Sequence, residues 1–130
     1  MDNIEKTLRI LKIEPQKLPY EKEINNDLKG IQGEVEGLFE CIYLDDNCIL
    51  VCNEEGKLNG MEPNRRLGTD IICGPFFICG DTPEGDFASL SESEIQRYSQ
   101  HFADVPEFTG KEPELEARMT FIGFDYFGGM

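Results

Sequence analysis

The sequence contains a single histidine, His101, and no tryptophan. No Ser-His or Cys-His relay can form without that one residue, and a histidine-based metal cluster is excluded. A Walker A motif and a GxGxxG loop are also absent, and these are the usual phosphate-binding signatures of nucleotide-dependent enzymes. His101 falls at the end of a predicted helix, where a cation interacts favourably with the helix dipole. We therefore expect a protein that is not an enzyme and has no catalytic residues.

Long apolar runs are missing as well. No stretch approaches the roughly 20 apolar residues that a membrane-spanning helix needs, and charged residues interrupt the apolar N-terminus (MDNIEKTLRILKIEP), unlike a signal peptide. The five cysteines are an odd number and lack the paired CxxC spacing of a structural zinc site. These patterns predict a cytoplasmic protein with reduced thiols, no metal, no cofactor and no membrane contact.

Basic residues are scarce. Twelve Lys and Arg residues stand against 26 Asp and Glu residues, which gives a formal charge of −14 and a pI near 4.3. Such a surface repels phosphate backbones, so direct nucleic-acid binding is not expected. The acidic residues are dispersed. Their charge either maintains solubility or imitates a nucleic acid and occupies another protein's DNA site.

The aromatic content (nine Phe, four Tyr) and 39% hydrophobic residues are enough for a core, and we expect one domain over residues 1–130. Alternating patterns predict strands, and periodic patterns predict two short helices. The predicted strands are residues 8–13, 20–24, 38–44, 48–52, 70–73, 75–79 and 118–127; the helices begin at residues 25–27 and 90–91. Pro75 favours a bulge or a sheet edge. This order indicates an α+β fold with a largely antiparallel sheet.

Residues 53–67 are predicted to be a long irregular loop, and the part of it from residue 57 to residue 67 has a local charge of +2, because Lys57, Arg65 and Arg66 outweigh Glu62. Asparagine side chains and free backbone amides in loops form anion-binding concavities, and arginine suits phosphate. Asparagines at positions 53, 59 and 64 share this loop. The arginines have an alternative role, which is to pair with the surplus acids. Since neighbours on an extended segment face opposite sides, one of the two is expected to be structural.

Aromatic and acidic residues that follow the loop could complete a ligand site. Phe76 and Phe77 are candidates for stacking on a nucleobase, and Asp81 and Asp86 for accepting hydrogen bonds from a ribose or an amino group. The alternatives are core packing for the phenylalanines and turn formation for the aspartates. The full candidate ligand set is Asn53, Lys57, Asn59, Asn64, Arg65, Arg66, Phe76, Phe77, Asp81 and Asp86.

Residues 52–60 (CNEEGKLNG) and 63–67 (PNRRL) resemble a family of small uncharacterised domains carried by bacteriophages and conjugative elements, often near antirestriction genes. The resemblance extends over residues 8–103 and includes 43–51 (YLDDNCILV), Gly80-Asp and Gly85-Asp-Phe. It does not include residues 107–130, which we expect to form a polar loop and a C-terminal aromatic strand.

The genomic setting of that family implies counter-defence in a host bacterial cell, by one of two mechanisms. In the first, which we favour, the protein sequesters a nucleotide immune signal, such as a cyclic ADP-ribose derivative, without cleaving it. In the second, the acidic protein imitates DNA and inhibits a restriction or CRISPR enzyme. A phosphate ligand needs a locally positive pocket in this acidic chain, which leads us to expect a homo-oligomer that brings basic loops together.

Overall fold

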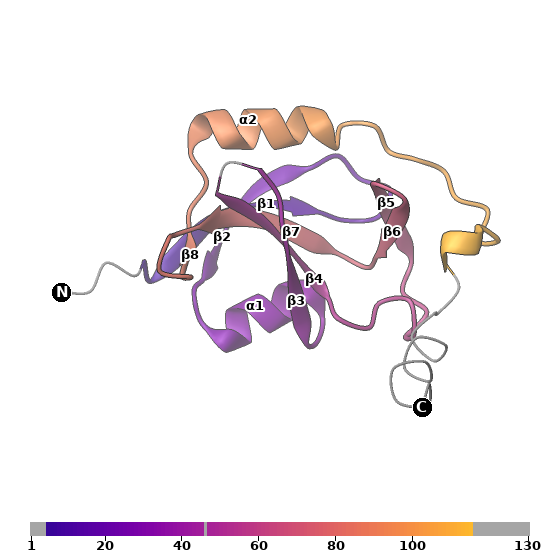
Figure 1. Ribbon diagram of the computed structural model, residues 1–130, viewed down its shortest axis with the longest axis horizontal. Helices are drawn as coiled ribbons and strands as arrows, with labels where there is room; N and C mark the ends of the chain where they lie inside the picture. The colour runs from indigo at the N-terminus through magenta and orange to yellow at the C-terminus, as the bar shows by residue number, and fades with distance from the viewer. Residues whose placement is uncertain (1–4, 46, 116–130) are drawn as a thin grey trace.

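A computed structural model describes residues 5–45 and 47–115 of the chain (Figure 1). A six-stranded antiparallel sheet forms its centre, in the order β2-β1-β7-β4-β3, with β8 paired to β7. A separate two-stranded sheet contains β5 and β6. The strands are β1 (Thr7–Ile13), β2 (Tyr20–Asn25), β3 (Phe39–Tyr43), β4 (Cys48–Asn53), β5 (Pro63–Leu67), β6 (Asp70–Cys73), β7 (Phe76–Asp81) and β8 (Phe87–Ala88). The helices are α1 (Leu28–Val35), α2 (Glu92–His101) and a 3-10 turn, η1 (Pro113–Leu115).

The main sheet has one helix on each face, α2 on one side and α1 on the other (Figure 1). Ile95 and Tyr98 of α2 pack into one apolar cluster, and Ile31 and Val35 of α1 pack into a second. Because both faces are covered, strands β4 and β7 are buried along almost their whole length. The chain therefore has the α+β fold with a mostly antiparallel sheet and two helices that the sequence predicts.

Local signals determine where both helices begin. The Asp27 side chain accepts a hydrogen bond from the Gly30 amide and caps α1. Ser91 and Glu94 form the predicted capping box of α2, with each side chain accepting from the other residue's amide. Glu36 ends α1 in the left-handed conformation, at φ 63°.

Two expectations about the strands were wrong. The second half of the predicted loop, Pro63–Leu67, is strand β5, which pairs with β6 after an irregularity between Pro63 and Arg65. Pro75 lies neither in a bulge nor at an edge. It immediately precedes β7, which is a central strand, so its missing N–H is not required by the ladder. Strand β8 was not predicted, and the expected strand at 118–127 lies outside the described residues.

Within the described ranges, no helix is long and apolar enough to cross a membrane.

Candidate functional site

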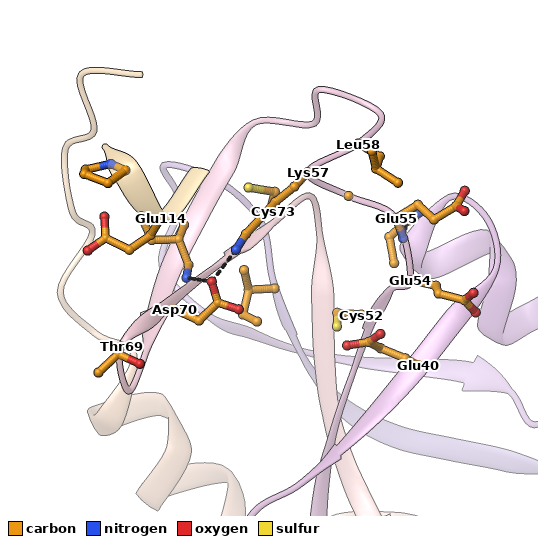
Figure 2. Close-up of a pocket in the computed structure, with 15 residues that line it drawn as sticks. Glu40, Cys52, Glu54, Glu55, Lys57, Leu58, Thr69, Asp70, Cys73 and Glu114 are labelled. Atoms are coloured by element: carbon orange, nitrogen blue, oxygen red, sulfur yellow. Dashed lines mark hydrogen bonds and ion pairs between the residues drawn. The ribbon is translucent and has the colours of Figure 1, made fainter. Parts of the chain in front are cut away.

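A cleft with a volume of about 720 Å³ opens where the β5–β6 sheet meets the end of β4 (Figure 2). The turn after β4, residues 54–61, forms one wall, and β6 with η1 forms the other. Among the residues that the structure describes, the charged ones that line it are Glu40, Glu54, Glu55, Lys57, Asp70 and Glu114.

Asn53 and Gly56 hold the turn in position. The buried Asn53 amide donates to the carbonyls of Val35 and Glu36 at 3.0 and 3.3 Å, and its Oδ1 accepts from the Glu55 amide at 2.8 Å. A side chain at position 56 would place Cβ 2.5 Å from the Cys73 carbonyl oxygen. Only glycine therefore allows the turn to approach β6 this closely.

The cleft is electrostatically negative. Its only lysine, Lys57, forms an ion pair with Asp70, whose Oδ1 also accepts from the Ile71 amide (Figure 2). Burial, together with the nearby charges of Glu54 and Asp70, raises the pKa of the Glu40 carboxyl. Neighbouring negative charges raise the pKa of a carboxyl because they repel its charged form, so a cationic group beside Glu40 would relieve this repulsion.

Glu114 adds a carboxylate with one unsatisfied oxygen to the wall that β6 and η1 form. Its Oε2 lies 3.4 Å from Arg66 Nη1, whereas its buried Oε1 has no hydrogen-bond partner among the described residues. A buried carboxylate oxygen without a donor is costly, and an incoming N–H or ammonium group would satisfy it.

The cysteines of the cleft do not form a nucleophilic site. Burial, followed by the charge of Glu40, raises the pKa of Cys52 to about 12, and burial also raises the pKa of Cys73. Both thiols are protonated at neutral pH, and a thiolate is the form that attacks or binds metal. Within the described residues, no group of three or more His, Cys, Asp or Glu side chains is arranged to hold a metal ion.

Glu40→Gln is expected to stabilise the fold at neutral pH, and the gain over wild type should shrink on acidification. A carboxyl whose pKa is raised by folding binds its proton more tightly in the folded state. Its contribution to stability therefore increases as the pH falls through the folded pKa. Urea denaturation at neutral pH and at about pH 4 measures the free energy of unfolding of the variant and of wild type under both conditions. Glu84→Gln, in the turn before β8, is the control; an equal gain from it would contradict the cleft effect.

The two loop arginines have different positions. Arg65 is 2% exposed and donates only to oxygens of the fold, so it cannot also bind a ligand. The side chain of Arg66 is 49% exposed, and its guanidinium lies 5.8 Å from the centre of the Phe108 ring and beside Glu114. The structure thus separates the adjacent pair, with Arg65 structural and Arg66 at the surface.

The asparagines of the predicted loop also differ in burial and in their contacts. Asn64 is buried and donates to the carbonyls of Ile13 and Gly74 at 2.9 Å each, so it joins β5 to the main sheet. Asn59 is exposed in the turn, where its backbone amide donates to the Glu55 carbonyl. Of the loop residues that were predicted to bind a ligand, only Asn53 and Lys57 line the cleft.

The remaining candidates lie elsewhere. Phe76 and Phe77 have no exposed surface and belong to the two core clusters, so neither presents a ring face to a ligand. Asp81 ends β7, and Asp86 closes a turn in which its amide donates to the Thr82 hydroxyl at 3.0 Å. Neither aspartate lines the cleft.

Sequence reasoning missed the acidic residues of the cleft. One signal could have found some of them: residues 30–56 contain seven Asp and Glu residues and no Lys or Arg. That segment carries half of the chain's net charge of −14 in a fifth of its length, and it includes Glu40, Glu54 and Glu55. Asp70 and Glu114, on the other wall, are distant from this segment in the sequence, and only the fold places them beside it.

Comparison with known proteins adds one match. A family model described as a domain of unknown function (DUF3846) matches residues 8–103, which include every described strand and both α-helices except the first residue of β1. A search of the curated proteins and of the solved structures found no match to the chain. The matched span is well over half of the sequence, and the chain therefore belongs to the DUF3846 family.

Proposed function

We propose that this protein acts without catalysis, by binding a positively charged, nucleic-acid-binding region of another protein. The observation that carries the proposal is the cleft, in which the described residues contribute five carboxylates and one lysine, and that lysine is already paired with Asp70. A basic side chain from a partner would relieve the repulsion at Glu40 and give the buried Glu114 oxygen a donor.

The charge of the whole chain supports the same reading. At −14 it attracts a basic surface over the range of the screening length and speeds encounter. In the setting that the resemblance implies, the partner would be a restriction or CRISPR enzyme in the cytoplasm of a host bacterium, and its DNA site would be blocked.

Calorimetric titration with an acetylated, amidated hexa-arginine peptide tests the cleft. Glu40→Gln/Glu54→Gln is expected to weaken binding by at least about tenfold, roughly 1.4 kcal/mol. The control variant Glu84→Gln/Asp104→Asn changes the net charge equally but outside the cleft, and is expected to stay within about twofold of wild type. Equal weakening by both pairs would show that binding is only long-range attraction and would remove the cleft from the proposal.

Nucleotide sequestration is a second candidate, and one observation favours it: Arg66 and Phe108 place an exposed cation beside an aromatic ring. A phosphate would contact Arg66, and a base would stack on Phe108. Because the adjoining cleft is acidic, two subunits would have to bring their Arg66 and Phe108 side chains together to form a positive site. A thermal-shift screen against cyclic ADP-ribose isomers, cyclic dinucleotides and NAD tests this reading. A shift that Arg66→Ala abolishes, with the nucleotide recovered uncleaved by chromatography, would support sequestration, whereas no shift with any of these nucleotides would rule it out.

A further inference from the structure

The two edges of the main sheet differ in how they are protected. The outer strand β2 carries charges of both signs, and its Glu21 and Lys22 are held in ion pairs with Arg9 and Glu34. Interleaved charged side chains of this kind prevent a further strand from pairing. Strand β3, at the opposite edge, has no basic residue, no proline and an unbroken register with β4.

Hydrogen bonds at both ends of the β3–β4 ladder establish which backbone groups face outward. The Glu54 amide donates to the Leu38 carbonyl at 2.8 Å, and the Leu44 amide donates to the Cys48 carbonyl at 2.9 Å. In an antiparallel ladder, every second residue bonds to the neighbouring strand. The even-numbered residues from 38 to 44 therefore bond toward β4, and the odd-numbered residues point their N–H and C=O groups away from it.

The outward groups belong to Phe39, Cys41 and Tyr43. No strand or turn within the described part of the chain pairs with them. They form three donors and three acceptors in a row, which is the pattern that an added strand uses. Tyr43 is 72% exposed and Leu38 61% exposed, so apolar contact area is available at both ends of the row.

Glu40 connects this edge to the acidic cleft. It lies on β3 opposite Cys52, and both residues line the cleft, so the Glu40 side chain stands on the cleft face of the edge strand. An added strand would place a residue opposite Glu40 in a non-hydrogen-bonded pair, where side chains approach most closely. The segment from residue 30 to residue 56 contains no Lys or Arg, so the negative charge of Glu40 favours a basic residue at the opposite position of the added strand.

We propose that β3 accepts an extended basic segment of a partner protein as an additional antiparallel strand, with its Lys or Arg side chains on the cleft face beside Glu40. The proposal rests on the function proposed above and names the form of the partner. Main-chain hydrogen bonds to Phe39, Cys41 and Tyr43 supply affinity, and the carboxylates of the cleft select basic side chains.

Two isomeric peptides test the strand addition. Both have the acetylated, amidated sequence Lys-Val-Lys-Val-Lys-Val; one is N-methylated at its lysines and the other at its valines. With lysines opposite Glu40, the valine amides face β3, so only the lysine-methylated peptide keeps the donors that the edge requires. It is expected to bind at least about tenfold more tightly than the valine-methylated peptide of equal charge.

A variant of the protein tests the same bonds from the other side. Cys41→Pro removes an outward N–H but no bond to β4, and proline is tolerated on an edge strand in that position. It is expected to weaken binding of the lysine-methylated peptide by at least about tenfold, while Cys41→Ser binds like wild type. Circular dichroism of both variants verifies that the fold is retained.

The outcomes separate the two proposals. If both peptides bind equally, and only Glu40→Gln/Glu54→Gln weakens them, strand addition is overturned and the acidic cleft remains the site. If neither peptide binding nor hexa-arginine binding depends on the cleft charges, both proposals fall. A dimer of the protein alone in sedimentation, dissociated by Cys41→Pro, would assign the edge to a second copy and overturn the peptide proposal.

Discussion

Replacing Arg65 with methionine is expected to lower the free energy of unfolding by about 3 kcal/mol, within the range for removing a buried, hydrogen-bonded charge. The guanidinium donates to the carbonyls of Phe102, Asn64 and Lys17 at 3.2, 3.2 and 2.6 Å, and to Asn64 Oδ1 at 2.9 Å. Methionine fills a similar volume but leaves these oxygens without donors. Urea denaturation measures the difference.

The adjacent arginine is the matched control. Arg66→Met removes the same charge from an exposed site with one long ion pair, and should cost less than about 1 kcal/mol. Equal losses from the two variants would mean that the hydrogen bonds of Arg65 contribute no more than a surface charge does.

Phe76→Ala is expected to destabilise the fold by about 4 kcal/mol, because it removes a fully buried ring from the central strand. The ring packs edge-on against Phe102 at 5.6 Å between centroids, so its loss leaves a cavity between β7 and the end of α2. Thermal and urea unfolding of the variant, compared with wild type, measure the effect.

Tyr43→Ala is the control for this prediction. Its side chain is 72% exposed on the edge strand, and truncation should change stability by about 0.5 kcal/mol or less. If Phe76→Ala unfolded at the same urea concentration as Tyr43→Ala, the Phe76 ring would not be part of the core. Phe76 would then again be a candidate for stacking on a ligand.

Strong local patterns predicted most of the fold. The β3–β4 hairpin and the capping box of α2 are both present where the sequence places them, since each depends on residues within a few positions of one another. Strand β5 was missed because its inward positions hold Asn64 and Arg65, which are polar. Their burial depends on carbonyls contributed by distant segments, which no local pattern reveals.

The candidate site was harder to predict than the fold. The sequence correctly indicated that one arginine of the pair is structural, but not which one, because the register of β5 decides that. Phe76 and Phe77 are both buried only because helices cover both faces of β7. The cleft joins β3, the turn after β4, β6 and η1, and its acidic character becomes visible only when these segments meet.

The position of Arg65 bears on how the molecule opens. One guanidinium joins β5 to the turn before β2 at Lys17 and to the residue that caps α2, Phe102. The small sheet cannot separate from the main sheet without exposing a cation and breaking bonds to both places at once. We therefore expect the β5–β6 sheet, which forms one wall of the cleft, to unfold together with the core as one cooperative unit.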